Sequence, residues 1–383
     1  MTARHRLRIA LVRIGVLLGR LLGPPGRRVL LASSNAAEIG GNLAFIRDEL
    51  RRRQPAVPIV VVAYRTSYSI RGLARAAIGS LLAGFHLARA RVSIVDDYFL
   101  PMYVAKPPGT TYLQVWHASG AFKRFGYGVL DKSFGQTSEL VTQRPIHVNY
   151  DTCLVSAMRF APVYAEAFRQ PLDRFIASTG IPRTDILFGE RRTEAERRVR
   201  ARYDLPAKRT ILYAPTFRGD TSTSARAPVT LDLRLLQREL GADHVLLLRQ
   251  HPYVRAQAPL DPALHSFVID VSDHGDIHEL MLVSDVLVTD YSSAIFEFSL
   301  LGRPMAFFAP DLADYVDERG FYFDYREGVP GPVFQTTEEL AHWLRAGDFD
   351  QEQVSRFRAA AFDIADGHAT ERFVDRVVLP ALG

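Results

Sequence analysis

The sequence predicts an α/β protein made of two Rossmann-like domains. The chain has 383 residues, of which 48% are hydrophobic and 23% charged, a composition typical of globular proteins. Short aliphatic runs alternate with longer amphipathic stretches, which is the pattern of parallel strands covered by helices on both faces. The runs fall into two sets, and the length also favours two domains, since a domain usually has roughly 100 to 200 residues.

The first domain is predicted to span residues 27–190. Its aliphatic runs are rich in Val, Ile and Leu, as expected of strands inside a parallel sheet. They are residues 29–32, 59–62, 92–95, 112–115 and 152–155.

The second domain is predicted to span residues 191–355. A helical segment at 190–203 is dense in Arg and Glu, which suits a solvent-facing connector, so we place the joint near 183–205. Residues 356–383 are predicted to form a helical tail, with packing back on the first domain as one option. The aliphatic runs of this domain are residues 210–213, 244–248, 267–270, 286–288 and 305–308.

Residues 1–26 are predicted to contain a basic amphipathic helix. Its apolar residues recur at the spacing that lines one helix face, and its arginines lie largely elsewhere. The longest uncharged stretch, 14–19, is far short of the roughly 20 residues that cross a bilayer. The apolar residues are Leu7, Leu11, Ile14, Leu18 and Leu21, and the arginines assigned to the membrane surface are Arg6, Arg13 and Arg20.

We expect this helix to lie on an anionic membrane surface, where each arginine contributes about 1 kcal/mol. The alternative is a helix packed on the body of the protein or on a partner, because amphipathicity alone does not name what the apolar face meets. A cleaved secretory signal is disfavoured because Arg13 and Arg20 interrupt the apolar stretch.

Charge, cysteine and motif content exclude several classes of protein. Residues 1–28 carry seven arginines and no acid, more than the whole net charge of +5, so the body is not a basic nucleic-acid-binding surface. The single cysteine, Cys153, excludes an intrachain disulfide framework. Neither a G-x-G-x-x-G fingerprint nor a Walker A loop is present, which disfavours dehydrogenases and P-loop kinases.

Ligands of open α/β sheets bind outside the carboxyl ends of the strands, so the residues after each run are the candidates. His117 follows the run at 112–115, and Lys123 and Arg124 come shortly after it. His251 follows the run at 244–248, next to Arg249. Most histidines of a protein are structural, but these two follow buried strands and have cations nearby. Such a position suits a histidine that deprotonates a hydroxyl beside a phosphate. No other histidine or cysteine stands near either histidine at a spacing typical of zinc ligands, so a zinc site is disfavoured.

Three other segments carry groups that suit phosphate binding. Ser292 and Ser293 lie between a strand and a helix start, where hydroxyls and backbone N–H groups bind phosphate oxygens or simply cap the helix. Thr216 and Arg218 follow the run at 210–213, and an ordinary turn is the competing interpretation. Arg183 lies near the domain joint, where a surface pair with Asp185 is the alternative.

Six blocks of the sequence together resemble the CDP-glycerol glycerophosphotransferase family of teichoic-acid synthesis. They are WHASGAFKRFG, GIPRTD, YAPTFRG, RQHPYV, SDVLVTDYSSAIFEF and DGHATERF. The resemblance implies a GT-B-like fold with a cleft between its domains. It also implies transfer of glycerol phosphate from CDP-glycerol to a hydroxyl of a lipid-linked acceptor, with release of CMP.

The resemblance also assigns site residues. The two catalytic histidines of the family fall on His117 and His251, and the turn after His117 carries the acceptor side. Donor binding falls on Arg183, Thr216, Arg218, Arg249, Ser292, Ser293 and Glu297, and the acceptor side on Ser119, Lys123 and Arg124.

We expect His117 to act as general base and His251 with Arg249 to stabilise the diphosphate, although the two histidines could exchange roles. No acidic cluster adjoins these groups, so we expect neither metal nor cofactor. The expected partners are CDP-glycerol, a polyprenyl-diphosphate-linked saccharide and an anionic membrane surface. The expected location is the cytoplasmic face of the membrane, as a peripheral protein, and a homo-oligomer is left open.

The resemblance to short family members favours the priming step, and a poly(glycerol or ribitol phosphate) polymerase is the alternative within the family. A nucleotide-sugar glycosyltransferase shares the fold and would release a nucleoside diphosphate instead of CMP. A membrane-bound scaffold that binds glycolipids without reacting is the non-enzymatic alternative.

Overall fold

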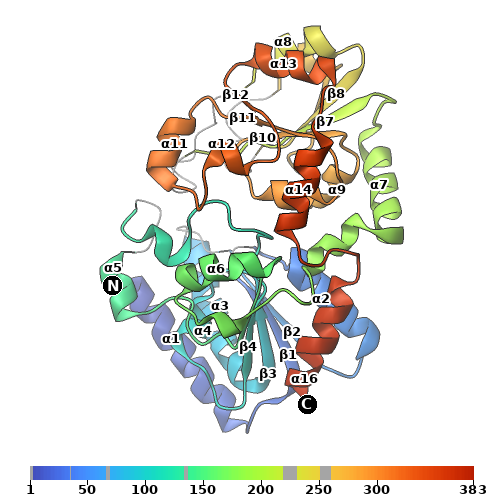
Figure 1. The fold of residues 1–383 in the computed structure, drawn as a ribbon. Coiled ribbons are helices and arrows are strands. Elements are labelled where there is room, and N and C mark those ends of the chain that lie inside the picture. Colours follow the sequence, from blue (N-terminus) through green and yellow to red (C-terminus); the bar gives the residue numbers. More distant parts are fainter. Residues whose placement is uncertain (1–2, 35, 66–69, 133–136, 219–230, 251–259) are drawn as a thin grey trace.

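The computed structural model describes residues 3–34, 36–65, 70–132, 137–218, 231–250 and 260–383. They form two α/β domains, each around a six-stranded sheet in which all strand pairs are parallel. Figure 1 shows the two domains one above the other, with the first sheet below and the second above. The predicted fold class is thereby confirmed.

The first sheet has the strand order β2-β1-β3-β4-β5-β6. Its strands are β1 (Gly26–Ser33), β2 (Ile59–Ala63), β3 (Ala90–Val95), β4 (Thr111–Gln114), β5 (Thr152–Leu154) and β6 (Phe175–Ile176). The first five coincide with the predicted runs, whereas the two-residue β6 was not predicted. Its helices are α1 (Ala3–Leu21), α2 (Gly41–Arg53), α3 (Ile70–Arg89), α4 (Leu100–Val104), η1 (Gly126–Val129), α5 (Ser138–Gln143), η2 (Met158–Phe160), α6 (Ala161–Phe168), η3 (Leu172–Arg174) and η4 (Pro182–Leu187).

The second sheet has the order β12-β11-β10-β7-β8-β9. Its strands are β7 (Arg209–Tyr213), β8 (His244–Leu248), β9 (Val268–Asp270), β10 (Val286–Thr289), β11 (Met305–Phe308) and β12 (Val333–Phe334). The two-residue β12 is again the strand that the sequence did not predict. Its helices are α7 (Gly189–Tyr203), α8 (Leu233–Leu240), η6 (Pro262–Leu264), α9 (Ile277–Leu282), α10 (Ala294–Ser299), α11 (Leu312–Arg319), α12 (Tyr325–Gly328), α13 (Thr337–Ala346) and α14 (Gln351–Ala361).

The strand order reverses at one point in each sheet, which is where α/β proteins bind ligands. In the second sheet the reversal lies between β7 and β10, which are neighbours although the chain visits β8 and β9 in between. All residues of β8 and β10 are buried, which explains their unbroken aliphatic sequences. The loops that follow β7 and β10 therefore emerge side by side at the edge that faces the first domain.

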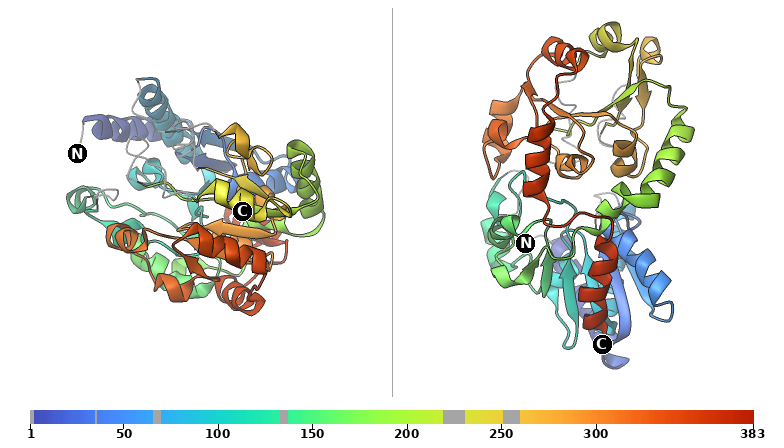
Figure 2. Two further views of the ribbon diagram at one scale, coloured as in Figure 1. Left: turned by 90° about the horizontal axis from the view of Figure 1, so that it is seen from above. Right: turned by 45° about the vertical axis from the view of Figure 1, so that its right-hand side comes forward.

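The C-terminal segment crosses from the second domain to the first. Figures 1 and 2 show α14 beside the second domain, whereas α15 (Ala369–Phe373), η7 (Val374–Val378) and α16 (Leu379–Leu382) lie against the first. The buried Asp185 carboxylate accepts hydrogen bonds from the backbone N–H groups of Ala369 and Thr370, at 2.9 and 2.8 Å. The predicted boundary at residue 355 falls inside α14, and that at residue 190 falls inside α7.

Helix α1 packs along α3 through glycines. The spacing of the apolar residues in α1 did not indicate this contact. A Cβ atom at Gly84 would lie 2.2 Å from the carbonyl oxygen of Val12, and one at Gly15 would lie 2.1 Å from that of Leu81. The two backbones can approach this closely only because these positions lack side chains. The face of α1 with the buried residues Ile9, Val12, Val16 and the glycines meets the protein, so most of the predicted leucine face is directed elsewhere.

Most of the predicted apolar residues of α1 are exposed. Leu7, Ile14, Leu18 and Leu21 have exposed fractions of 56%, 46%, 47% and 81%, and Leu11 is half-buried. No helix in the described part of the chain is long and apolar enough to span a membrane.

Candidate active site

A tight turn after β4 places His117 at the edge of the first sheet. Trp116 has a left-handed backbone with φ of 50°, which redirects the chain directly after the strand. The Asn42 side chain on α2 stabilises the turn by donating to the carbonyl oxygens of Val115 and Trp116, at 3.1 and 2.9 Å. Gln114 accepts the Trp116 N–H at 2.9 Å. The sharp turn is thus held by partners that lie on two different elements.

The His117 ring is half-exposed and is held through Nδ1. This atom lies 3.3 Å from the carbonyl oxygen of Asp96 and 3.4 Å from Oδ2 of Asp97, both directly after β3. Both partners accept hydrogen bonds, so Nδ1 carries the proton and Nε2 keeps a lone pair in the neutral ring. The ring also lies 4.5 Å from that of Trp116. His117 therefore has the tautomer that a general base acting through Nε2 requires.

Asp96 lies behind His117 and is half-buried, with its Oδ1 atom fully buried. Its pKa is raised to about 6, mainly by burial and also by the nearby Asp97, while a hydrogen bond from Ser33 and the proximity of His117 oppose the shift. An unfolded chain would release this proton near pH 4, whereas the folded protein retains it up to about pH 6.

The contribution of Asp96 to stability should therefore decrease as pH rises from about 4 to about 6, because only the folded state still binds its proton in that window. We expect Asp96→Asn to remove this loss. Its stability relative to the wild type should increase across the window by up to about 3 kcal/mol and stay constant above it. Urea denaturation at several pH values between 4.5 and 8 measures the difference, and a difference independent of pH would contradict the prediction.

A buried ionic network joins the two domains next to this histidine. Glu297, on α10, accepts a hydrogen bond from Ser119 Oγ at 2.7 Å and forms an ion pair with Arg183 on η4. Arg183 also donates to the carbonyl oxygen of His117 at 2.5 Å. Burial opposes ionisation of Glu297, but Arg183, His278 and Ser119 outweigh it and hold its pKa below the usual value. Glu297 therefore stays charged and connects the domains.

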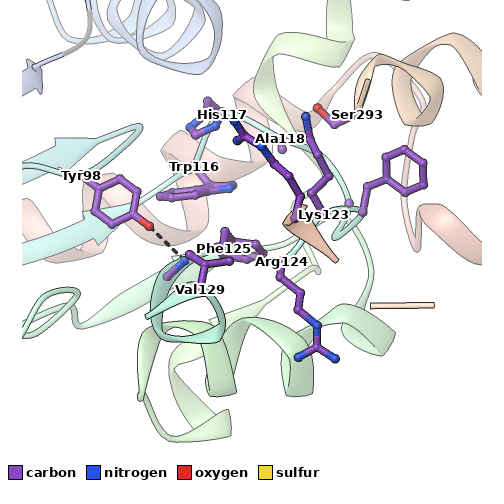
Figure 3. A pocket seen from close by; sticks show the side chains of 13 residues that line it. Tyr98, Trp116, His117, Ala118, Lys123, Arg124, Phe125, Val129 and Ser293 are labelled. Atoms are coloured by element: carbon purple, nitrogen blue, oxygen red, sulfur yellow. Dashed lines mark hydrogen bonds between the residues drawn. The ribbon is translucent and has the colours of Figure 1, made fainter. Parts of the chain in front are cut away.

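The first pocket, a cavity of about 480 Å³, lies between the domains around His117. Its aromatic wall includes Tyr98, Trp116 and Phe125, and Lys123, Ser293 and Arg319 contribute polar groups. Figure 3 shows the Lys123 side chain extending toward Ser293, whereas the side chain of Arg124, which also lines the cavity, extends away from Ser293. A half-aromatic, half-cationic cavity suits a ligand that combines an apolar or sugar surface with negative charge.

A second pocket, of about 230 Å³, follows the ends of β7, β8 and β10. Thr216, Arg249 and Ser292 line it, together with Tyr315 and Ile277. Burial lowers the pKa of Arg249, and Asp276 opposes that shift. None of the described residues that line either pocket is an aspartate or a glutamate. Both pockets are therefore cationic, as an anionic ligand such as a diphosphate requires.

Some predicted site residues lie outside the two pockets. Arg218 forms ion pairs with Asp290 and Asp311, at 2.9 and 2.6 Å, and its guanidinium lies 4.8 Å from the ring centre of Tyr291. Burial opposes its charge, but the two carboxylates outweigh this effect and raise its pKa. Its position fits a support for the loop after β7, and its predicted contact with the donor stays a prediction.

The remaining predicted residues also differ in whether they line a pocket. Ser119 is fully buried and contacts Glu297. Ser119, Arg183 and Glu297 are absent from the lining of both pockets. Arg124 lines the first pocket, and its side chain is exposed over the Tyr322 ring. His251 lies outside the described residues. The sequence missed Tyr98, Phe125, Tyr315 and Arg319, which reach the pockets from turns and a helix rather than from the positions directly after predicted strands.

In the described part of the chain, no group of three histidine, cysteine or acidic side chains is arranged to hold a metal ion. The expectation of metal-free catalysis stays a prediction.

Comparison with known proteins finds relatives that belong to teichoic-acid synthesis. A family model described as CDP-Glycerol:Poly(glycerophosphate) glycerophosphotransferase matches residues 22–379. The chain is 36% identical to the teichoic acid ribitol-phosphate primase of Bacillus spizizenii, over 94% of this chain and 92% of that protein. It is 32% identical to the teichoic acid glycerol-phosphate primase of the same organism, over 77% of this chain and 76% of that protein.

A solved structure of the wall teichoic acid polymerase TagF superimposes with a TM-score of 0.80 at 25% sequence identity, over 98% of this chain and 94% of that one. The two-domain GT-B-like fold is therefore shared with a structurally characterised protein.

Proposed function

Because the chain belongs to the CDP-glycerol:poly(glycerophosphate) glycerophosphotransferase family, we propose that it transfers glycerol phosphate from CDP-glycerol to a hydroxyl of a lipid-linked saccharide and releases CMP. The observation that carries the proposal is the pair of cationic pockets, one beside His117 and one beside Arg249. A base and a diphosphate site are the two components that such a transfer needs.

The proposed reaction forms a bond between the acceptor oxygen and the phosphorus that bears glycerol. The bond from that phosphorus to the bridging oxygen breaks, and this oxygen leaves with CMP. His117 takes the hydroxyl proton on Nε2, while Arg249, Thr216 and Ser292 hold the nucleotide diphosphate. The aromatic wall of the first pocket suits the acceptor saccharide. The reaction fits priming, the step named for both primases to which the chain is similar.

Ribitol phosphate is the second candidate for the transferred group. The identity to the ribitol-phosphate primase is higher, and it extends over more of both chains, than the identity to the glycerol-phosphate primase. The two donors share the CDP portion, so the second pocket does not distinguish them.

The decisive experiment incubates the purified protein with CDP-glycerol or CDP-ribitol and a synthetic lipid-linked disaccharide. We expect CMP and a product heavier by one polyol phosphate, and the preferred donor identifies the polyol. Products with many units would indicate polymerisation. A nucleoside diphosphate from a nucleotide sugar, without CMP release from either CDP-polyol, would contradict the proposal. We expect turnover to persist in the presence of a chelator, and a strict requirement for added divalent metal would refute that expectation.

We also propose that the protein acts at the cytoplasmic face of the membrane and binds the surface through α1 and α3. The leucines of α1 are exposed, and Ile78 and Leu82 of the adjacent α3 have exposed fractions of 59% and 45%. Figure 1 shows these two helices side by side at the lower left of the first domain. Exposed apolar residues flanked by arginines fit an anionic lipid surface.

The double variant Leu17→Glu/Leu21→Glu tests this surface without removing the helix that packs on α3. Leu17 and Leu21 have exposed fractions of 61% and 81%, so the substitutions leave the core intact. We expect at least about tenfold weaker binding to anionic vesicles, since burying one leucine contributes roughly 1.5–3 kcal/mol. Leu172→Glu, at a residue that is 55% exposed on η3, is the matched control. Undiminished vesicle binding by the double variant would remove this proposal.

A further inference from the structure

Two cationic side chains, one from each domain, stand where the two pockets meet. Of the residues that the structure describes, Lys123 and Arg319 are the ones that line both cavities. The adjacent serines Ser292 and Ser293 line the second and the first cavity respectively, so the cavities adjoin at this point. Lys123 was assigned to the acceptor side from the sequence, and Arg319 was assigned no role.

Main-chain hydrogen bonds between the domains hold the backbone segments that carry both cations. Lys123 and Phe321 form an antiparallel bridge, in which the Arg124 N–H donates to the Gly320 carbonyl at 3.1 Å. The Tyr322 N–H donates to the Phe122 carbonyl at 3.1 Å. Because Gly320 directly follows Arg319, this bridge sets the separation of the two main-chain segments from which the cationic side chains extend. Such preorganised charges lose little freedom when a ligand binds.

Aromatic packing supports the same arrangement. The Phe122 ring lies 5.1 Å from that of Phe321 and 5.7 Å from that of Tyr325, so residue 122 is anchored in the second domain. The Lys123 ammonium lies 6.0 Å from the ring centre of Tyr315, one helical turn before Arg319 on α11. Glu318 approaches Arg319 at 3.7 Å but lines neither cavity.

The position of these cations determines what they can contact. The acceptor oxygen has to reach His117 in the first cavity, and the nucleotide has to reach Arg249 in the second. The phosphorus that passes between them must then lie at the shared boundary. We propose that Lys123 and Arg319 together bind the non-bridging oxygens of the transferred phosphoryl group and stabilise its charge during transfer. This inference rests on the proposed function and names the groups that act on its reacting atoms.

Variants at these positions should separate catalysis from nucleotide binding. CMP lacks the transferred phosphoryl group, so Lys123→Met and Arg319→Met should change its dissociation constant less than about threefold, while kcat falls about 10² to 10³-fold. Arg249→Met, in the second cavity alone, should weaken CMP binding about tenfold or more. Arg319→Lys should recover part of the loss, because it restores the charge but not the paired donors.

The experiment uses the full chain, with CMP binding measured by calorimetry and turnover measured by CMP release from the preferred CDP-polyol. Arg345→Met is the matched control, because Arg345 on α13 pairs with Glu239 on α8. Figure 1 shows these two helices at the end of the second domain that is away from the first domain. A kcat within threefold of the wild type in both variants overturns the inference. So does a loss of CMP affinity as large as that of Arg249→Met, since it would place the two cations in the nucleotide site. A wild-type protein that turns over neither CDP-polyol overturns the proposed function itself, and the inference with it.

Discussion

Replacing His117 with alanine is expected to lower kcat about 10² to 10⁴-fold, the range that a general base typically contributes. The neutral ring keeps its proton on Nδ1 because the Asp96 carbonyl and the Asp97 carboxylate both accept there, which leaves Nε2 for the acceptor hydroxyl. The ring is half-exposed, so its removal leaves no buried cavity and should not unfold the protein.

The measurement is CMP release at saturating donor and acceptor, together with calorimetric CMP binding, which should stay unchanged. His117→Asn removes the base while keeping a polar side chain, and we expect a loss of similar size. His342→Ala, at an exposed residue on α13, is the matched control. Near-wild-type CMP release from His117→Ala would end the assignment of this histidine as the base.

Removing the carboxylate of Glu297 is expected to cost about 3–5 kcal/mol of stability, because it leaves a buried guanidinium without its counter-ion. The side chains of Arg183 and Glu297 have exposed fractions of 13% and 1%, so water cannot replace the lost partner. Glu297→Ala also removes the acceptor for Ser119. Since the pair spans the domains, the coupling between them should weaken as well.

The two tryptophans allow both effects to be measured. Trp116 lies in the first domain and Trp343 in the second, and each can be replaced by phenylalanine so that fluorescence reports one domain at a time. We expect coincident urea transitions in the wild type and separate transitions in Glu297→Ala.

Two further variants serve as controls for this pair. Glu194→Gln breaks the exposed pair with Arg197 and should cost less than about 1 kcal/mol. The double variant Arg183→Met/Glu297→Leu should recover much of the stability, because it leaves no unpaired buried charge. A loss below about 1 kcal/mol in Glu297→Ala would show that the ion pair does not hold the domains together.

Much of the fold was predictable from the sequence because buried parallel strands need unbroken aliphatic segments. All ten predicted runs are strands, and the two that were missed, β6 and β12, have two residues each and carry no pattern of their own. The same rule located His117, Arg249, Ser292 and Ser293, because a residue that directly follows a buried strand emerges at the ligand-binding edge of the sheet.

The sequence could not show which polar residues that lie far apart along the chain partner one another. Ser119 and Glu297 are 178 positions apart, and Arg218 and Asp311 are 93 positions apart, so no local spacing connects them. These contacts hold Ser119, Glu297 and Arg218 outside the two pockets, although the family resemblance assigns them to the acceptor or the donor. Arg319 was missed for the converse reason, since it ends a helix and reaches the pockets only through the bridge between the domains.

The positions of the longer strands along the chain, the residues at their carboxyl ends and the family membership followed from local aliphatic patterns and short motifs, because each depends on residues that are close along the chain. The tertiary structure alone decided which face of α1 is buried, which charges pair across the domains and which two cations border both pockets. These features depend on how closely distant backbones approach, as at Gly84 and at the bridge from Lys123 to Phe321. Such distances are set by packing rather than by sequence spacing.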